Sequence, residues 1–126
     1  MRVLLVVVGA AMWLPATVSA SDTESLIASK TAVVSAADVV RSARLDWEAA
    51  HELLLERQLA VQVIEFKMEK EAAPEPATAQ TLASAREVWK RALQNLEAKA
   101  VQLGRAEQLL RDAEERLNKT YAGGTK

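Results

Sequence analysis

The sequence contains no cysteine, and its 126 residues include three prolines, four glycines, one histidine and only 4% aromatic residues. Without cysteine the chain forms no disulfide bond and has no thiol nucleophile. Half of its residues are hydrophobic and 26% are charged, a mixture that favours long helices over a globular α/β core. We therefore expect one all-α domain whose stability comes from helix packing or from a binding partner.

An excess of charge of one sign is also missing. The chain has 16 basic and 17 acidic residues, so its net charge is −1. A field that attracts nucleic acid or an anionic membrane needs clustered positive charge over a domain. We therefore predict no nucleic-acid partner.

Motifs for catalysis are absent as well, because the sequence has neither G-x-S-x-G nor a phosphate-binding G-x-x-x-x-G-K-[ST] loop. His51 is the only histidine, and Glu48, Glu52 and Glu56 lie near it. A metal site needs two or more nitrogen or sulfur ligands at helical spacing, and His-Glu-Leu-Leu-Leu is not H-E-x-x-H. We predict no catalytic residue, no metal ligand and no cofactor, and interpret these carboxylates as a solvated surface.

Large apolar residues recur every seven positions through two segments, as they do at position a of a coiled coil. Smaller residues, mostly alanine, follow three places later at position d. The a positions are Leu26, Val33, Val40, Trp47, Leu54, Val61 and Met68, and then Leu82, Trp89, Leu96, Leu103, Leu110 and Leu117. Alanine occupies d at positions 36, 43, 50, 85, 92, 106 and 113, while Lys99 and Thr120 take the other two d positions of the second segment. The sequence therefore predicts two helices joined by one extended seam.

The aromatic and basic residues that could suggest a ligand site have simpler explanations. Trp47 and Trp89 both occupy a positions, so we interpret them as layers of the seam. Arg86, Lys90 and Arg91 form a local basic cluster, which we interpret as a solvated helix face opposite Glu65.

Turn signals divide the chain into two helices. We predict the first helix over residues 21–73, beginning at a capping-box pattern, Ser21-x-x-Glu24. A proline turn follows at 74–76, where two prolines exclude helical structure. The second helix is expected over 77–121, with Gly123 and Gly124 ending it and a flexible tail at 122–126. Since short connections join antiparallel neighbours, the predicted fold is a long antiparallel two-helix coiled-coil hairpin.

Two alignments of the helices fit this turn, with the residue numbers of facing a and d positions adding to 153 or to 146. The first sets a large residue against a small one in nearly every layer, for example Val61 with Ala92, which allows close packing. It also brings Glu65 near Arg86 and Arg44 near Glu107. We therefore predict the 153 register.

The first 20 residues have the pattern of a secretory signal peptide. Arg2 supplies a positive start, residues 3–14 are almost entirely apolar, and Pro15 ends the run before the small-residue site Val18-Ser19-Ala20. We predict cleavage after Ala20 and a mature chain without a transmembrane helix. The alternative, an uncleaved membrane anchor, is less favoured because the apolar run is too short to span a bilayer without including Pro15 and Thr17.

A leader of this kind implies a secreted or cell-surface protein, or, in a bacterium, a periplasmic one. Asn118-Lys119-Thr120 is an N-glycosylation sequon, which makes Asn118 a glycosylation candidate if the host is a eukaryote.

A second apolar stripe runs along the first helix, away from the seam. At 100° per residue Leu55, Leu59, Val63 and Phe66 lie within about 80° of one another, and Leu45 extends the stripe after Glu48 and Glu52. The outer face of the second helix is polar, at residues 90, 94, 97, 108, 112 and 115. A contiguous apolar patch on a solvated helix usually marks an interface. We predict a protein partner here, either a third helix absent from this chain or the same stripe of a second copy.

The alanine-rich repeats over Ala32–Leu55 and Leu82–Leu117, following a leader, resemble the N-terminal helical hairpin of African trypanosome surface proteins of the variant surface glycoprotein and helical receptor type. The resemblance covers Ser21 to about Tyr121, rests on general pattern, and carries over no functional residue. It implies a non-enzymatic hairpin acting as a structural coat, spacer or interaction module. The alternative that the residues leave open is a periplasmic coiled-coil adaptor or chaperone-like binding module of a bacterium.

Overall fold

The computed structural model describes residues 20–124, which form two helices and a short connection. Helix α2 spans Ala20–Lys70 and helix α3 spans Pro76–Gly124. No strand occurs within these residues, and the two helices pack against each other as an antiparallel hairpin. The all-α hairpin predicted from the heptads is confirmed, whereas residues 1–19 of the predicted signal peptide lie outside the described residues.

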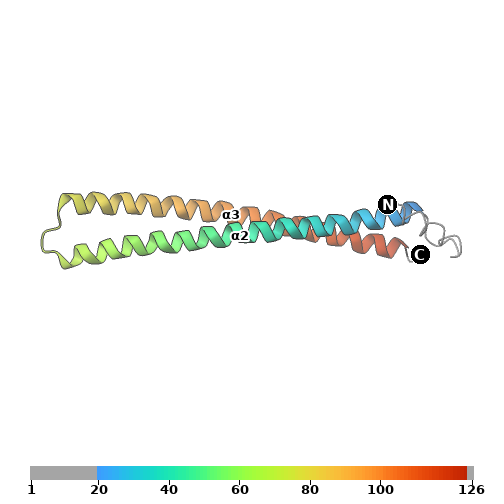
Figure 1. Ribbon diagram of the computed structural model, residues 1–126, viewed down its shortest axis with the longest axis horizontal. Helices are drawn as coiled ribbons and strands as arrows, with labels where there is room; N and C mark the ends of the chain where they lie inside the picture. The colour runs from blue at the N-terminus through green and yellow to red at the C-terminus, as the bar shows by residue number, and fades with distance from the viewer. Residues whose placement is uncertain (1–19, 125–126) are drawn as a thin grey trace, which may run out of the picture. The chain divides into compact units, whose positions relative to one another are not determined.

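The hairpin divides into two compact units. The turn unit, residues 41–105, contains the second part of α2, the connection and the first part of α3, which run antiparallel (Figure 1, green to orange). The terminal unit pairs the start of α2, up to Val40, with the end of α3, from Ala106 onward (Figure 1, blue and red). Each unit is built from one stretch of each helix.

Burial follows the heptad in both units. Every buried residue of the described chain occupies an a or d position: Val40, Ala50, Val61, Leu82, Ala92, Ala106 and Ala113. The remaining a and d residues are half-buried, except for Arg57, whose side chain is exposed. Lys99, the other charged residue at a seam position, is half-buried, as expected where a long aliphatic stem covers apolar surface and the ammonium group stays in water. The seam is therefore the core that the sequence predicts.

Two cross-helix contacts support the 153 register, one in each unit. In the turn unit Arg86 Nη2 donates to Glu65 Oε2 over 3.1 Å, which confirms the predicted pair. In the terminal unit Lys30 Nζ lies 5.8 Å from the centre of the Tyr121 ring. Both pairs join residues at position e of the heptad, one place after d. When the numbers of facing a and d residues add to 153, those of facing e residues add to 151, as they do in both pairs. The pair of Arg44 with Glu107 would join different units and stays a prediction.

Helix α2 begins slightly earlier and ends slightly earlier than the sequence indicates. It includes Ala20 and Ser21, so Ser21 lies inside the first turn and is not the N-cap of the predicted capping box. At the other end Glu71 N donates to Met68 O over 3.2 Å, a tighter bond that closes the last turn three residues before Pro74. Proline restricts the residue before it as well as itself, so the helix stops well short of the predicted Ala73.

Helix α3 begins at Pro76, which the sequence places in the turn. The carbonyl of Glu75 accepts hydrogen bonds from Thr78 N at 3.0 Å and from Ala79 N at 3.3 Å, so Glu75 acts as the N-cap residue. Proline suits the first helical position, because the amide that it lacks would have no partner within the helix. The connection is therefore residues 71–75.

The end of α3 differs most from expectation. The helix continues through Gly123 to Gly124 instead of ending near Tyr121. No glycine among the described residues has a positive φ, so this glycine pair does not end the helix in the left-handed conformation that is common after helices. Glycine permits that conformation but does not enforce it.

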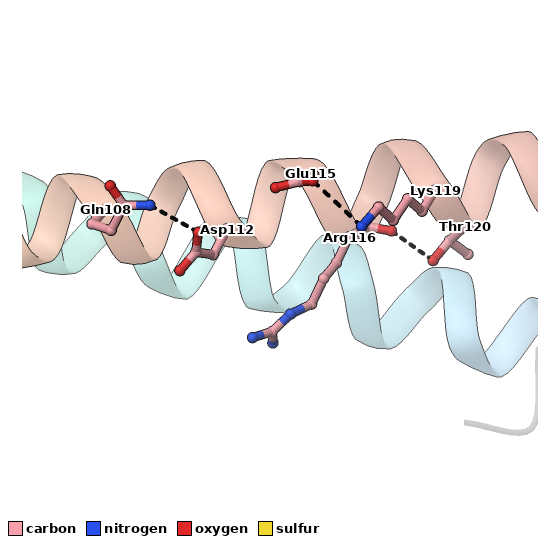
Figure 2. Close-up of polar contacts among 6 residues, drawn as sticks. All are labelled: Gln108, Asp112, Glu115, Arg116, Lys119 and Thr120. Atoms are coloured by element: carbon pink, nitrogen blue, oxygen red, sulfur yellow. Dashed lines mark hydrogen bonds and ion pairs between the residues drawn. The ribbon is translucent and has the colours of Figure 1, made fainter.

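Polar contacts along the outer face of α3 are local (Figure 2). Lys119 Nζ lies 3.4 Å from Glu115 Oε1, one turn apart. Asp112 accepts a 2.9 Å hydrogen bond from Gln108 Nε2, and Arg111 donates to Gln108 Oε1 over 2.7 Å. These exposed pairs contribute a few tenths of a kcal/mol each, so the seam remains the main source of stability.

The burial of alanine at seam positions predicts that added volume at such a position is costly. Replacing buried Ala92, which the register sets level with buried Val61, by leucine should destabilise the fold by about 1–3 kcal/mol through overpacking. Thermal unfolding followed by circular dichroism measures this. Ala98→Leu is the matched control, because Ala98 is exposed on the same helix and should tolerate leucine. Equal melting temperatures for the two variants would contradict the proposed packing.

Gly104 offers the opposite test. It lies exposed within α3, and a Cβ built there has no atom within 4 Å. Gly104→Ala should therefore stabilise the fold by up to about 1 kcal/mol, because alanine loses less backbone entropy on entering a helix. Gly123→Ala, near the helix end, should change the melting temperature much less. A lower melting temperature for Gly104→Ala would show that Gly104 makes a close contact with something other than the two helices.

Candidate interaction surface

The predicted stripe on α2 lies in solvent. Leu55, Leu59, Val63 and Phe66 have between 51% and 60% of their surface exposed. They follow one another at intervals of four, four and three residues, which places them on one helix face. Because the seam occupies the opposite side of α2, nothing in the hairpin covers this face. We call these four residues the α2 stripe.

Other exposed apolar residues of α2 share the same sector of the helical wheel. Leu45 is 60% exposed, as the sequence analysis expected, and Ile27 and Val34 are also exposed. At 100° per residue all three fall within the angular range of the stripe. Ile27 and Val34 are not among the residues predicted from the sequence, although the same periodicity could have found them. Charged residues such as Glu48 separate them from the α2 stripe, which remains the densest apolar segment.

Helix α3 has no comparable stripe. Its exposed large apolar residues are Val88, Leu93, Val101, Leu109 and Tyr121. At 100° per residue the first four point in widely separated directions around the helix. Scattered apolar residues of this kind are normal on a protein surface. The outer face of α3 is therefore polar, as predicted, and it provides a natural reference for experiments on α2.

Opposite charges bracket the α2 stripe. Glu52 and Glu56 lie at its N-terminal end, and Lys67 and Lys70 lie at its C-terminal end, in the last turn of α2. All four side chains are exposed, and no salt bridge within residues 20–124 involves any of them. Lys70 Nζ instead lies 5.1 Å from the centre of the Phe66 ring, a cation–π distance. The surface is thus acidic, then apolar, then basic along the chain.

His51 lies on α2 beside the seam residue Trp47. Its ring stacks on that of Trp47, with centroids 5.3 Å apart and planes inclined by 16°. Glu48, Glu52 and Glu56 are exposed. In the described part of the chain, no three histidine, aspartate or glutamate side chains converge as they would around a metal ion. The aromatic stack accounts for the half-buried histidine.

Two of the three residues in the basic cluster on α3, Arg86 and Arg91, are paired with carboxylates. Arg86 pairs with Glu65 across the seam, and Arg91 Nε lies 3.7 Å from Glu87 Oε1 on the same helix. A phosphate would have to compete with both carboxylates. Both arginines of the cluster therefore already have a carboxylate partner within the hairpin.

Trp89 borders a shallow hollow of about 250 Å³ between the helices of the turn unit. Gln58, Val61, Gln62, Glu65 and Arg86 line the rest of it. The Nε1 atom of Trp89 is buried without a hydrogen-bond partner, which costs free energy unless water reaches it. The hollow is open and small for a dry ligand pocket, so it is best explained as a solvated gap beside a bulky a-position residue.

The sequon lies inside α3, near its C-terminal end. Asn118 is helical and its side chain is exposed. Thr120 is half-buried, and its hydroxyl donates to the carbonyl of Arg116 over 2.9 Å, which Figure 2 shows. Ser29 Oγ lies 3.2 Å from the same hydroxyl oxygen, so Thr120 also ties the two helices of the terminal unit together. Glycosylation of Asn118 stays a prediction.

Comparisons with protein-family models, with curated proteins and with solved structures found no significant match to this chain. Among the described helices, none has an apolar stretch of the length and hydropathy that crossing a membrane requires.

Proposed function

We propose that this protein is a non-enzymatic, secreted or cell-surface helical hairpin that acts as a structural or interaction module, and that the α2 stripe is its binding surface. The observation that carries the proposal is the contrast between the two helices. Four consecutive stripe residues of α2 expose more than half of their surface on one face, whereas the exposed apolar residues of α3 are scattered. A patch of that kind on an otherwise polar helix is typical of an interface.

The seam supports this role by presenting the stripe on a rigid element. A single amphipathic helix would use its only apolar face for binding and would be marginal by itself in water. Here α3 covers the seam face of α2 and leaves a second apolar face available. The half-exposed leucine, valine and phenylalanine side chains are held on a helix that is already formed, so binding does not have to order the backbone.

The location outside the cytosol rests on the leader at residues 1–20, and the coat or spacer role rests also on the resemblance to trypanosome surface proteins. A chain without cysteine gains no disulfide in an oxidising compartment. Helix packing and a bound partner would then supply its stability, which fits a protein that works in an assembly.

Charged substitutions in the stripe test whether it is the binding surface. We expect the purified mature chain to self-associate through exposed apolar surface, and Leu59→Glu with Phe66→Glu to yield a soluble monomer that is still helical. Light scattering measures the mass and circular dichroism measures the helicity. Val101→Glu with Leu109→Glu is the matched control, because these α3 residues are similarly exposed but lie outside any stripe. A wild-type chain that stays monomeric at high concentration, with full helicity, would show that the stripe does not mediate self-association.

Processing tests the proposed location. Expression with the leader in a eukaryotic secretory host should release a chain that begins at Ser21, because Val18-Ser19-Ala20 is the small-residue site that follows the apolar run. Intact mass decides this, and a product that keeps residues 1–14 would contradict it.

A glycan that disappears in Asn118→Gln would favour the surface-protein role over the bacterial periplasmic alternative, whereas an unmodified Asn118 would remove that support.

A further inference from the structure

We propose that the partner of the α2 stripe is the same stripe of a second copy of this chain, laid antiparallel about a two-fold axis that crosses the stripe midway between Leu59 and Val63. The inference rests on the proposed function, since it identifies the occupant of the surface described above. The charge pattern along the stripe supports it, because this pattern complements itself in one orientation only.

On the stripe and the flank that carries Glu56 and Lys67, the order is acidic, apolar and basic from Glu52 to Lys70, while Glu65 and Glu69 lie on the other flank. In an antiparallel pair the acidic end of one stripe meets the basic end of the other, and the two-fold axis creates this match twice. In a parallel pair the acidic ends would meet each other, as would the basic ends, and like charges across an interface oppose association. Antiparallel self-pairing therefore gives these exposed and unbridged side chains opposite partners.

The spacing of the residues supports the same alignment. When facing residue numbers add to about 122, Leu59 of each copy faces Val63 of the other, at the centre of the contact. Leu55 then lies level with Phe66, and further out Glu52 meets Lys70 and Glu56 meets Lys67. Glu56 and Lys67 lie on the same flank of the stripe at 100° per residue, and matching flanks face each other in an antiparallel pair of helices. Apolar residues thus occupy the centre and ion pairs its two ends, as in protein interfaces with an apolar core and a polar rim.

The contact is modest in size. It uses about 20 residues of one helix per copy, a length of roughly 30 Å. A contact between two single helices of this length lies near the lower limit of specific protein–protein interfaces, so we expect reversible association that depends on protein concentration. The charged ends then matter for orientation more than for affinity, and the association should weaken as the salt concentration rises.

Charge reversal tests the orientation. Glu52→Lys with Glu56→Lys, and separately Lys67→Glu with Lys70→Glu, should each weaken self-association by about tenfold, because four exposed ion pairs become four repulsive contacts. A mixture of the two variants should associate as strongly as the wild type, since a mixed dimer restores every opposite-charge pair. The chain that carries all four substitutions should also self-associate normally. Analytical ultracentrifugation gives the dissociation constants.

Controls separate orientation from net charge. Glu97→Lys with Glu115→Lys makes the same change in net charge as Glu52→Lys with Glu56→Lys, but on exposed positions of α3, and it should leave self-association within about twofold of the wild type. Circular dichroism checks that each variant remains helical. If the reversed variants associate as well as the wild type, or if the mixture is no stronger than either variant, antiparallel pairing is wrong.

Cross-linking provides a direct geometric readout, because the natural chain has no cysteine. Gln62→Cys lies close to the proposed two-fold axis and should form a disulfide-linked dimer under mild oxidation. Lys70→Cys should not, since its two copies would be roughly 27 Å apart along the helix axis, whereas a parallel pair would link them. Efficient linkage through Lys70→Cys would overturn the proposal.

The outcomes distinguish this inference from the proposed function. If Leu59→Glu with Phe66→Glu abolishes association while charge reversal has no effect, the stripe binds but does not pair antiparallel with itself. If the wild-type chain is a monomer at every concentration, the second copy is excluded as the partner. If association persists in the stripe variant and the charge-reversed chains alike, the α2 stripe is not the binding surface.

Discussion

The structure depends on the packing of large against small residues along one seam. Alanine at d lets the backbones approach closely, and the large residue at a on the facing helix fills the space that alanine leaves. All seven buried residues belong to this pattern, four of them alanines. In a chain with 4% aromatic residues and no disulfide, no other contact of comparable extent holds the described helices together.

This seam also explains why so much apolar surface remains uncovered. Two helices can bury only one face of each, and the described part of the chain contains no side chain that is completely inaccessible to solvent. A third layer would be needed to cover the outer face of α2. The exposed stripe follows from a helix that has two apolar faces in a fold that provides one neighbour.

Electrostatics play a secondary role in the seam but can direct contacts at the surface. The Glu65–Arg86 pair is about half exposed, so it helps to define the alignment of the helices and adds little free energy. The same weakness makes charge useful at the stripe ends. Exposed charges that are too weak to hold two molecules together can still select one orientation of an apolar contact.

The amino-acid sequence by itself determined the helical class, the antiparallel hairpin, the buried heptad positions, the Glu65–Arg86 pair and the α2 stripe. These features arise from periodicity, which requires only that the helix repeats every 3.6 residues, and from the proline-rich connection between the two runs.

The tertiary structure decided what periodicity leaves open. Pro76 is the first residue of α3 because Glu75 serves as the N-cap, and α3 continues through two glycines, which allow a helix to end but do not force it to end. Lys30 lies over Tyr121, and Thr120 joins Ser29, because rotamers and exact helix offset select among several side chains within reach. Gln108 donates a hydrogen bond to Asp112 and accepts one from Arg111, since a neutral amide can donate and accept at once. Sequence patterns identify which faces meet, whereas the contacts within each face depend on distances of a few ångströms that only the folded chain sets.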